Sequence, residues 1–136
     1  MLPKRLLLAL LFLFTLNPFA QAADKLKELV VHAGETVYAR FEVQGRKLKL
    51  VAASKEPDAQ AQVIFTLERD AQKLKTNLRV ENKFPKDFIY RAELRIPARG
   101  LHGPANVTPV VAGKLALESF PVPAEEMAAF DFKLAK

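Results

Sequence analysis

The sequence predicts an all-β fold, an antiparallel β-sandwich of seven to nine short strands. Apolar and polar residues alternate with a period of two from about residue 26 onward, which is the pattern of half-buried strands. The apolar runs are short and recur about every ten residues, with turn residues between them. Beyond residue 22, apolar residues do not repeat at helical spacing, which disfavours parallel sheets because these need crossover helices. A small barrel is the alternative.

The start of the chain has the three parts of a cleavable secretory signal. Lys4 and Arg5 form a positive beginning, residues 6–16 are an almost unbroken apolar run, and Ala20-Gln21-Ala22 is an A-x-A cleavage site. The apolar run is too short for a membrane-spanning helix, which needs about 20 residues. We therefore expect residues 1–22 to be a signal peptide cleaved after Ala22. An uncleaved membrane anchor is the alternative.

The remaining residues, 23–136, are expected to form a single β-sandwich domain, periplasmic or secreted. Such a chain can bury a core without disulfides, and it contains no cysteine to form one. The whole sequence has a net charge of +6, and the signal peptide contributes two of these charges through Lys4 and Arg5. The remaining positive excess favours anionic partners without specifying one. No segment of this domain approaches the length of a membrane span.

The first three strands are expected at residues 26–31, 35–43 and 47–53. The second and third are joined by a hairpin turn at Gly45, because glycine tolerates positive φ. The inward-facing residues expected in these two strands are Val37, Ala39, Phe41, Val43, Leu48, Leu50 and Ala52.

The next three strands are expected at residues 62–68, 73–81 and 88–96. A loop around Pro85 leads into the last of them. This last strand has the most regular alternation, and Pro97 ends it because proline cannot donate to a central ladder. The expected inward residues are Val63, Phe65, Leu67, Leu74, Leu78, Val80, Phe88, Tyr90, Ala92, Leu94 and Ile96.

The last third of the chain combines a long loop with three further strands. Residues 98–106 are rich in glycine and proline and are expected to form the loop. Residues 107–111 should form an edge strand, because they contain a proline. Strands follow at 114–120 and 128–134, with one helical turn at 124–127 between them. The expected inward residues are Leu115, Leu117, Phe130, Phe132 and Leu134.

Four short motifs lie mainly in the C-terminal half, at residues 78–82, 90–92, 109–113 and 118–121. Together they resemble a group of small exported β-sandwich proteins of Gram-negative bacteria, whose function is uncharacterised. Thr108 and Phe120 occupy places where members of this group tend to carry cysteine and tryptophan. The resemblance implies a periplasmic setting and a β-sandwich, and it implies no activity.

A looser resemblance concerns Tyr90 and Ala92. They have the spacing of the Tyr-x-Cys pair that marks a corner of immunoglobulin-type domains, without the cysteine. This resemblance implies an immunoglobulin-like arrangement of the sandwich.

The sequence contains no recognisable catalytic, metal-binding or cofactor-binding pattern. His32 and His102 are the only histidines, whereas a zinc site needs three or four ligands. Ser54 and Ser119 do not lie in a G-x-S-x-G motif, and no glycine-rich phosphate-binding motif occurs. We therefore expect a protein that is not an enzyme and uses no metal or cofactor.

Basic residues on the outward faces of three expected strands are the most suggestive feature. If these strands are neighbours, they form a positive face that could bind an anionic polymer. The ordinary interpretation is a solvated face with glutamates between the basic residues. Only one outward aromatic residue, Tyr38, accompanies them, which disfavours nucleic acid. The basic residues are Lys47, Lys49, Lys73, Lys75, Arg79, Arg91 and Arg95.

Three functions stay open on this basis. The favoured one is a non-enzymatic binding or accessory module of the cell envelope, whose partner is an envelope protein or an anionic envelope polymer. The second is a small hydrolase or hydrolase inhibitor whose site is built by residues 98–106, including His102. The third is binding of lipopolysaccharide or nucleic acid by the basic face.

Overall fold

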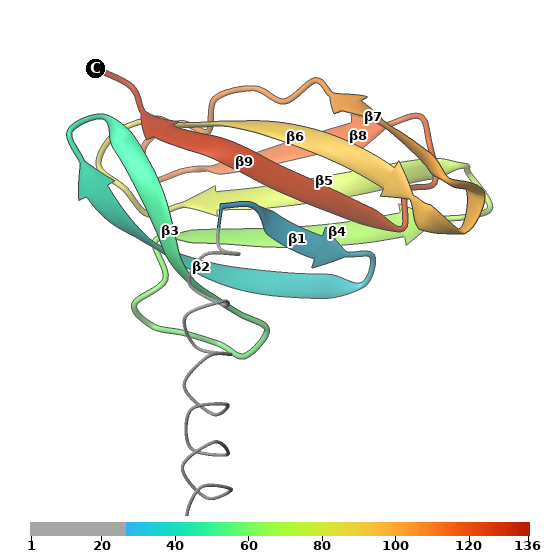
Figure 1. The fold of residues 1–136 in the computed structure, drawn as a ribbon, viewed down its shortest axis with the longest axis horizontal. Helices are drawn as coiled ribbons and strands as arrows, with labels where there is room; N and C mark the ends of the chain where they lie inside the picture. The colour runs from blue at the N-terminus through green and yellow to red at the C-terminus, as the bar shows by residue number, and fades with distance from the viewer. Residues whose placement is uncertain (1–26) are drawn as a thin grey trace, which may run out of the picture.

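Nine strands make up most of residues 27–136, the part of the chain that the computed structural model describes (Figure 1). The predicted all-β class is therefore confirmed. The expected signal peptide, residues 1–22, and its cleavage site lie outside the described residues. Within residues 27–136, no helix is long and apolar enough to cross a membrane. In chain order the elements are β1 (Leu29–His32), β2 (Glu35–Gln44), β3 (Lys47–Ser54), β4 (Val63–Asp70), β5 (Lys75–Asn82), β6 (Phe88–Ile96), the 3₁₀ turn η1 (Pro97–Arg99), β7 (Leu101–Ala105), β8 (Leu115–Phe120) and β9 (Glu126–Leu134).

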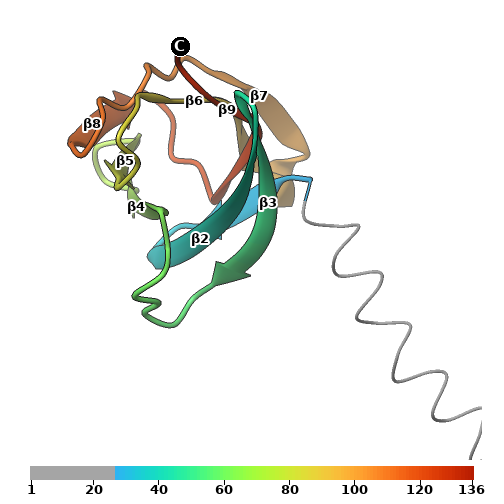
Figure 2. The same cartoon turned by 90° about the vertical axis from the view of Figure 1, so that its left-hand side faces the viewer.

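The strands pair antiparallel in the order β7-β6-β9-β3-β2-β4-β5-β8, and β1 pairs with β9. The sheet curls nearly into a barrel, as the end-on view in Figure 2 shows. The connection between β7 and β8 helps to close the curl. Its Val110 forms an isolated bridge to Phe88 of β6, with N–H···O distances of 2.9 Å in both directions.

Aromatic side chains from four strands meet inside the curled sheet. Phe41 of β2 packs edge-on against Phe132 of β9, with ring centroids 4.9 Å apart. Phe65 of β4 packs edge-on against Tyr90 of β6 at 5.7 Å, and Tyr90 stacks with Phe88 at 5.4 Å. These rings join both sides of the sheet, and edge-to-face and stacked pairs add stability beyond their buried area.

A β-bulge in β9 overturns the expected inward direction of Phe130. Ile89 of β6 is opposite Lys133, but Arg91 is opposite Phe130, so β9 has one extra residue between these pairs. Asp131 lies within the bulge and has a φ of 53°. The extra residue shifts the alternation, so that Phe130 faces outward and is only half-buried.

Strand β8 shows the opposite face from the one predicted. Its register places Leu117 opposite Arg79 on the outer face, and Leu115 and Leu117 are 43% and 75% exposed. Alternation allows either face, and burial of Phe120 decides between them. Glu118, which this choice turns inward, accepts hydrogen bonds from Thr108 N and Oγ1 at 2.8 and 2.7 Å.

The segment between β6 and β8 also differs from expectation. Within residues 98–106, predicted to be a loop, Leu101–Ala105 form the edge strand β7, which pairs with β6 and contains Pro104. Residues 107–111, predicted to be the edge strand, form only the bridge at Val110. A proline-containing segment does lie at an edge, as the missing donor requires, but one segment earlier.

Three further local expectations are wrong. Val43 is 50% exposed, because it lies near the protruding end of the β2–β3 hairpin. Leu74 is 62% exposed and has a φ of 52°, since it belongs to the turn before β5 rather than to the strand. The helical turn expected at residues 124–127 is absent, because β9 already begins at Glu126.

Asn82, at the end of β5, organises the neighbouring loops. Its side chain is buried, and its Nδ2 donates to the carbonyls of Lys86 at 2.9 Å and Val110 at 3.0 Å. Its Oδ1 accepts a hydrogen bond from Phe84 N at 2.9 Å. One amide therefore joins the β5–β6 loop to the segment that closes the sheet.

We expect Asn82→Ala to lower the free energy of unfolding by about 1–3 kcal/mol, because it leaves the buried Phe84 N–H without a partner and removes the bonds from the amide to the carbonyls of Lys86 and Val110. Urea unfolding followed by circular dichroism measures the change. Asn106→Ala, at an exposed position, is the control and should change stability by less than about 0.5 kcal/mol. Equal effects of the two substitutions would contradict the role of Asn82.

Candidate functional site

A groove with a volume of about 1100 Å³ lies between β3 and β9; we call it the β3–β9 groove. The two strands meet at one residue pair, Lys47 with Lys133. At this point Leu134 N donates to the carbonyl of Arg46 at 2.8 Å. Beyond it, β9 pairs with β1 instead, and β3 turns away (Figure 1). The groove opens where the two strands separate.

Bulges on both walls explain this separation. In β3, Val51 is the extra residue, because Leu50 and Ala52 lie opposite consecutive residues of β2. In β9, the bulge is the one at Asp131. Bulges bend a strand and increase its twist, so one in each strand directs β3 and β9 apart.

Positive charge surrounds the groove. Its basic residues are Lys27, Lys47, Lys49, Arg91 and Lys133. Asp131 is the only acidic residue in the lining, and its Oδ2 lies 3.1 Å from Arg91 Nη1. The four lysines are exposed and form no ion pair within residues 27–136. The groove's excess of four positive charges equals that of residues 27–136 as a whole, which contain 18 Lys and Arg and 14 Asp and Glu.

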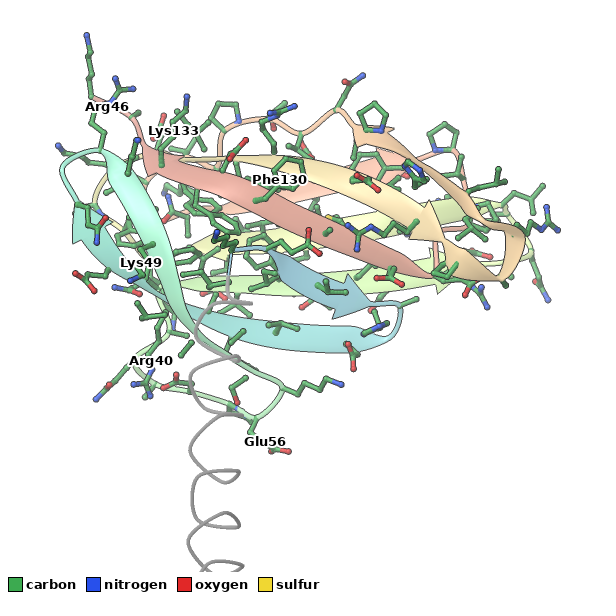
Figure 3. The ribbon with its side chains drawn as sticks, viewed as in Figure 1. Arg40, Arg46, Lys49, Glu56, Phe130 and Lys133 are labelled. Atoms are coloured by element: carbon green, nitrogen blue, oxygen red, sulfur yellow. The ribbon has the colours of Figure 1, made fainter. Side chains whose placement is uncertain are left out.

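The floor of the groove is apolar. Leu48, Leu50 and Phe132 reach it from the core and are almost fully buried. Val51 is 42% exposed and adds an accessible apolar surface. Figure 3 shows Lys49 on β3 and Lys133 on β9, the two strands that border this floor. An apolar floor with a basic rim suits a partner that carries both apolar groups and negative charge.

The structure brings together only three of the seven basic residues selected from the sequence, Lys47, Lys49 and Arg91. The groove also contains Lys27 and Lys133, which are not among those seven. The alternation predicts that Lys133 faces outward. Its closeness to Lys47, however, depends on the contact between β3 and β9, which are far apart in the sequence.

Lys73, Lys75 and Arg79 lie on the β4–β5 hairpin, where acidic groups accompany them. Lys73 N donates to the carboxylate of Asp70 at 3.0 Å, and Lys75 is the cross-strand partner of Asp70. Arg79 lies two residues from Glu81 on the same face of β5. This group has the character of a solvated face with mixed charge.

Arg95, at the far end of β6, is surrounded by carboxylates. Its guanidinium lies 3.2 Å from Glu93, 3.4 Å from Glu28 and 3.7 Å from Glu126. Partial burial opposes its charge, but the hydrogen bonds to Glu93 and Glu28 raise the pKa of Arg95. These carboxylates compensate the charge of Arg95, which joins β6 to β9 and to the residue before β1 and offers little attraction to an external anion.

A second hollow, of about 440 Å³, lies beside β6 and β7. Arg91 lines both hollows, and its guanidinium carbon lies 5.3 Å from the ring centroid of Phe130. His102, also in this lining, has its Nδ1 3.3 Å from Glu93 Oε1 and is largely exposed.

The histidines and serines of residues 27–136 do not form a nucleophile–base pair. His32 contacts Glu35 and His102 contacts Glu93. The Ser54 hydroxyl bonds to the main chain of Glu56. In this part of the chain, no group of three or more His, Cys, Asp or Glu residues is placed to hold a metal ion.

Tyr90 has a buried hydroxyl without a hydrogen-bond partner in the described part of the chain, and the same holds for Glu118 Oε2. Burial, with a smaller contribution from the negative charge of Glu118, raises the pKa of Tyr90 well above its ordinary range. The tyrosine therefore stays neutral, and its hydroxyl is a local cost to folding.

Glu35, near the turn that joins β1 to β2, has a carboxylate that contacts both Lys55 and His32. Its Oε2 lies 2.8 Å from Lys55 Nζ, and its Oε1 accepts a hydrogen bond from His32 N at 3.0 Å. The hydrogen bond with Lys55 is the largest cause that lowers the pKa of Glu35 to about 2; desolvation opposes it, and the bonds from His32 add to it.

Comparison of the chain with protein-family models, with curated proteins and with solved structures yields no match.

We expect Tyr90→Phe to raise the free energy of unfolding by about 1 kcal/mol, because it removes a buried hydroxyl without a partner and keeps the ring. Urea unfolding measures this. Tyr38→Phe is the control, since Tyr38 is only partly buried on the outer face, and its effect should stay within about 0.5 kcal/mol. A clear loss of stability in Tyr90→Phe would show that the hydroxyl is satisfied.

We expect Glu35→Gln to reduce stability near neutral pH and to have no effect near pH 2. The folded-state pKa of Glu35 is lowered from 4.5 to about 2, so its contribution is present above about pH 4.5 and is lost as the pH falls toward 2. Urea unfolding of both proteins across this range measures the difference. Glu56→Gln, at an exposed loop position, is the control. A Glu35→Gln effect that does not change with pH would contradict the assignment.

Proposed function

We propose that the chain is a non-enzymatic binding module of the cell envelope that holds an anionic partner in the β3–β9 groove. The observation that carries this proposal is the set of four lysines around an apolar floor that form no ion pair within residues 27–136. Elsewhere in residues 27–136, positive and negative charges balance. A concave site with such an excess attracts and retains anions better than scattered surface lysines do.

The proposed location, periplasmic or secreted, rests on the signal-peptide pattern of residues 1–22. In such a compartment, the partner would be an acidic envelope protein or an anionic envelope polymer. The positive charge of the groove favours this class of partner. Its apolar floor, which includes Leu50, Val51 and Phe132, favours a partner that also carries apolar groups.

We also propose an immunoglobulin-like sandwich as the finer description of the fold. The single pair between Lys47 and Lys133 is the weakest contact along the strand order. Divided there, strands β7-β6-β9-β1 and β3-β2-β4-β5-β8 form two sheets around the aromatic core. The groove would then lie at an open corner of the sandwich.

Charge reversal in the groove tests the function. We expect the purified protein to bind inorganic polyphosphate, measured by isothermal titration calorimetry, with an affinity that falls steeply as salt rises. Replacing Lys47 and Lys49 together by glutamate should weaken binding at low salt by about tenfold or more.

The matched control replaces Lys73 and Lys75 by glutamate, which changes the net charge equally on the β4–β5 hairpin. We expect at most about a twofold loss for this variant, through the change in overall charge alone. Equal losses in both variants would refute the groove as the anion site, and no binding at low salt would refute polyphosphate as its ligand.

A further inference from the structure

We infer that the anionic partner of the groove is an extended acidic polypeptide segment, which adds as a strand to the open edge of β3. This inference rests on the proposed function and names the chemistry of the ligand.

The main-chain edge of β3 is the first argument. From Tyr38 to Gln44, β2 occupies one side of β3 along its whole length. On the other side, Lys47 pairs with Lys133, and residues 48–54 pair with no strand within the described range of the chain. An edge of this kind presents N–H and C=O groups that another extended main chain can pair with.

The alternation of side chains along this edge is the second argument. Lys47 and Lys49 are exposed on one face of β3, and Leu48 and Leu50 are buried on the other. A strand added along residues 48–54 carries its own side chains in step, so that alternate residues lie beside Lys49, Val51 and Ala53 and the rest beside Leu48, Leu50 and Ala52. Lys47, which pairs with Lys133, lies at the near end of this stretch. Acidic residues suit the outward positions near Lys47 and Lys49, and apolar residues suit the inward positions.

The groove provides room for such a strand and positive charge on both sides. Lys133 and Arg91 approach from β9 and β6, opposite Lys47 and Lys49. An acidic strand between these walls separates like charges and pairs with each. Polyphosphate or a lipid headgroup would satisfy the lysines but leave the main-chain edge of β3 unpaired, and therefore the combined features favour a polypeptide.

The test uses fluorescein-labelled peptides and fluorescence anisotropy with the purified protein at low salt. The first peptide has seven residues, to match residues 48–54, with valine and glutamate in alternation. The second has the same composition, but its glutamates and valines are grouped in two blocks. We expect the alternating peptide to bind about tenfold more tightly, because only its pattern matches the two faces of β3.

Two further peptides test the main-chain pairing. They are the alternating peptide with N-methyl groups either on every valine or on every glutamate, so that each loses the donors along one edge only. We expect at least one of them to bind about tenfold more weakly than the parent. Hydrogen exchange should also show new protection of the amides of residues 48–54 when the parent peptide binds.

The outcomes separate the inference from the proposed function. One outcome is that polyphosphate, or vesicles containing phosphatidylglycerol, bind and that this binding depends on Lys47 and Lys49. If the peptides then do not bind, or bind equally well whatever their pattern and N-methylation, the strand-addition inference is wrong and the anion-binding groove stands. Binding of the alternating peptide that is unaffected by reversing Lys47 and Lys49 also overturns the inference. If neither polyphosphate, vesicles nor any peptide bind, both proposals fail.

Discussion

Strand β9 has one edge that two partners must share. Along its other edge it pairs with β6 over most of its length, whereas the shared edge serves β1 from Glu126 to Ala129 and β3 only at Lys133. The bulge at Asp131 bends the strand between these two partners. The curl of the sheet, the position of the groove and the open edge of β3 all follow from this division.

The same arrangement of strands decides which charged residues have partners of opposite charge. Arg95, Arg40 and Lys55 lie within hydrogen-bonding distance of carboxylates, and these contacts tie strands to neighbouring strands and loops. Among the described residues, 27–136, the lysines around the groove have no such partner, and β3 and β9 diverge beside them. Like charges on directly opposite residues, such as Lys47 and Lys133, disfavour the fold, so this basic cluster does not serve stability and remains available to a ligand.

Several elements could be predicted from the sequence because local chemistry decides them. The hairpin at Gly45, the alternation of β4 and β6, and the end of β6 at Pro97 are each set by residues next to one another. The predicted direction of side chains is wrong where alternation is ambiguous or interrupted. Leu115 and Leu117 fit either face of β8, and the bulge that turns Phe130 outward has no glycine to mark it. Burial of Phe120 and the pairing of β6 with β9 decide these cases.

For the candidate site, the sequence by itself determined the positive excess and the placement of lysines at outward strand positions. It also contains no recognisable catalytic pattern. The tertiary structure decided which of these residues meet. Lys47 and Lys133 are separated by most of the domain along the chain, yet they are cross-strand partners. Alternation reports which face of its own strand a side chain occupies, and it contains no information about which strand lies alongside. Neighbours are chosen by the packing of the whole aromatic core and by the sharing of edges among strands, and these are properties of the entire chain.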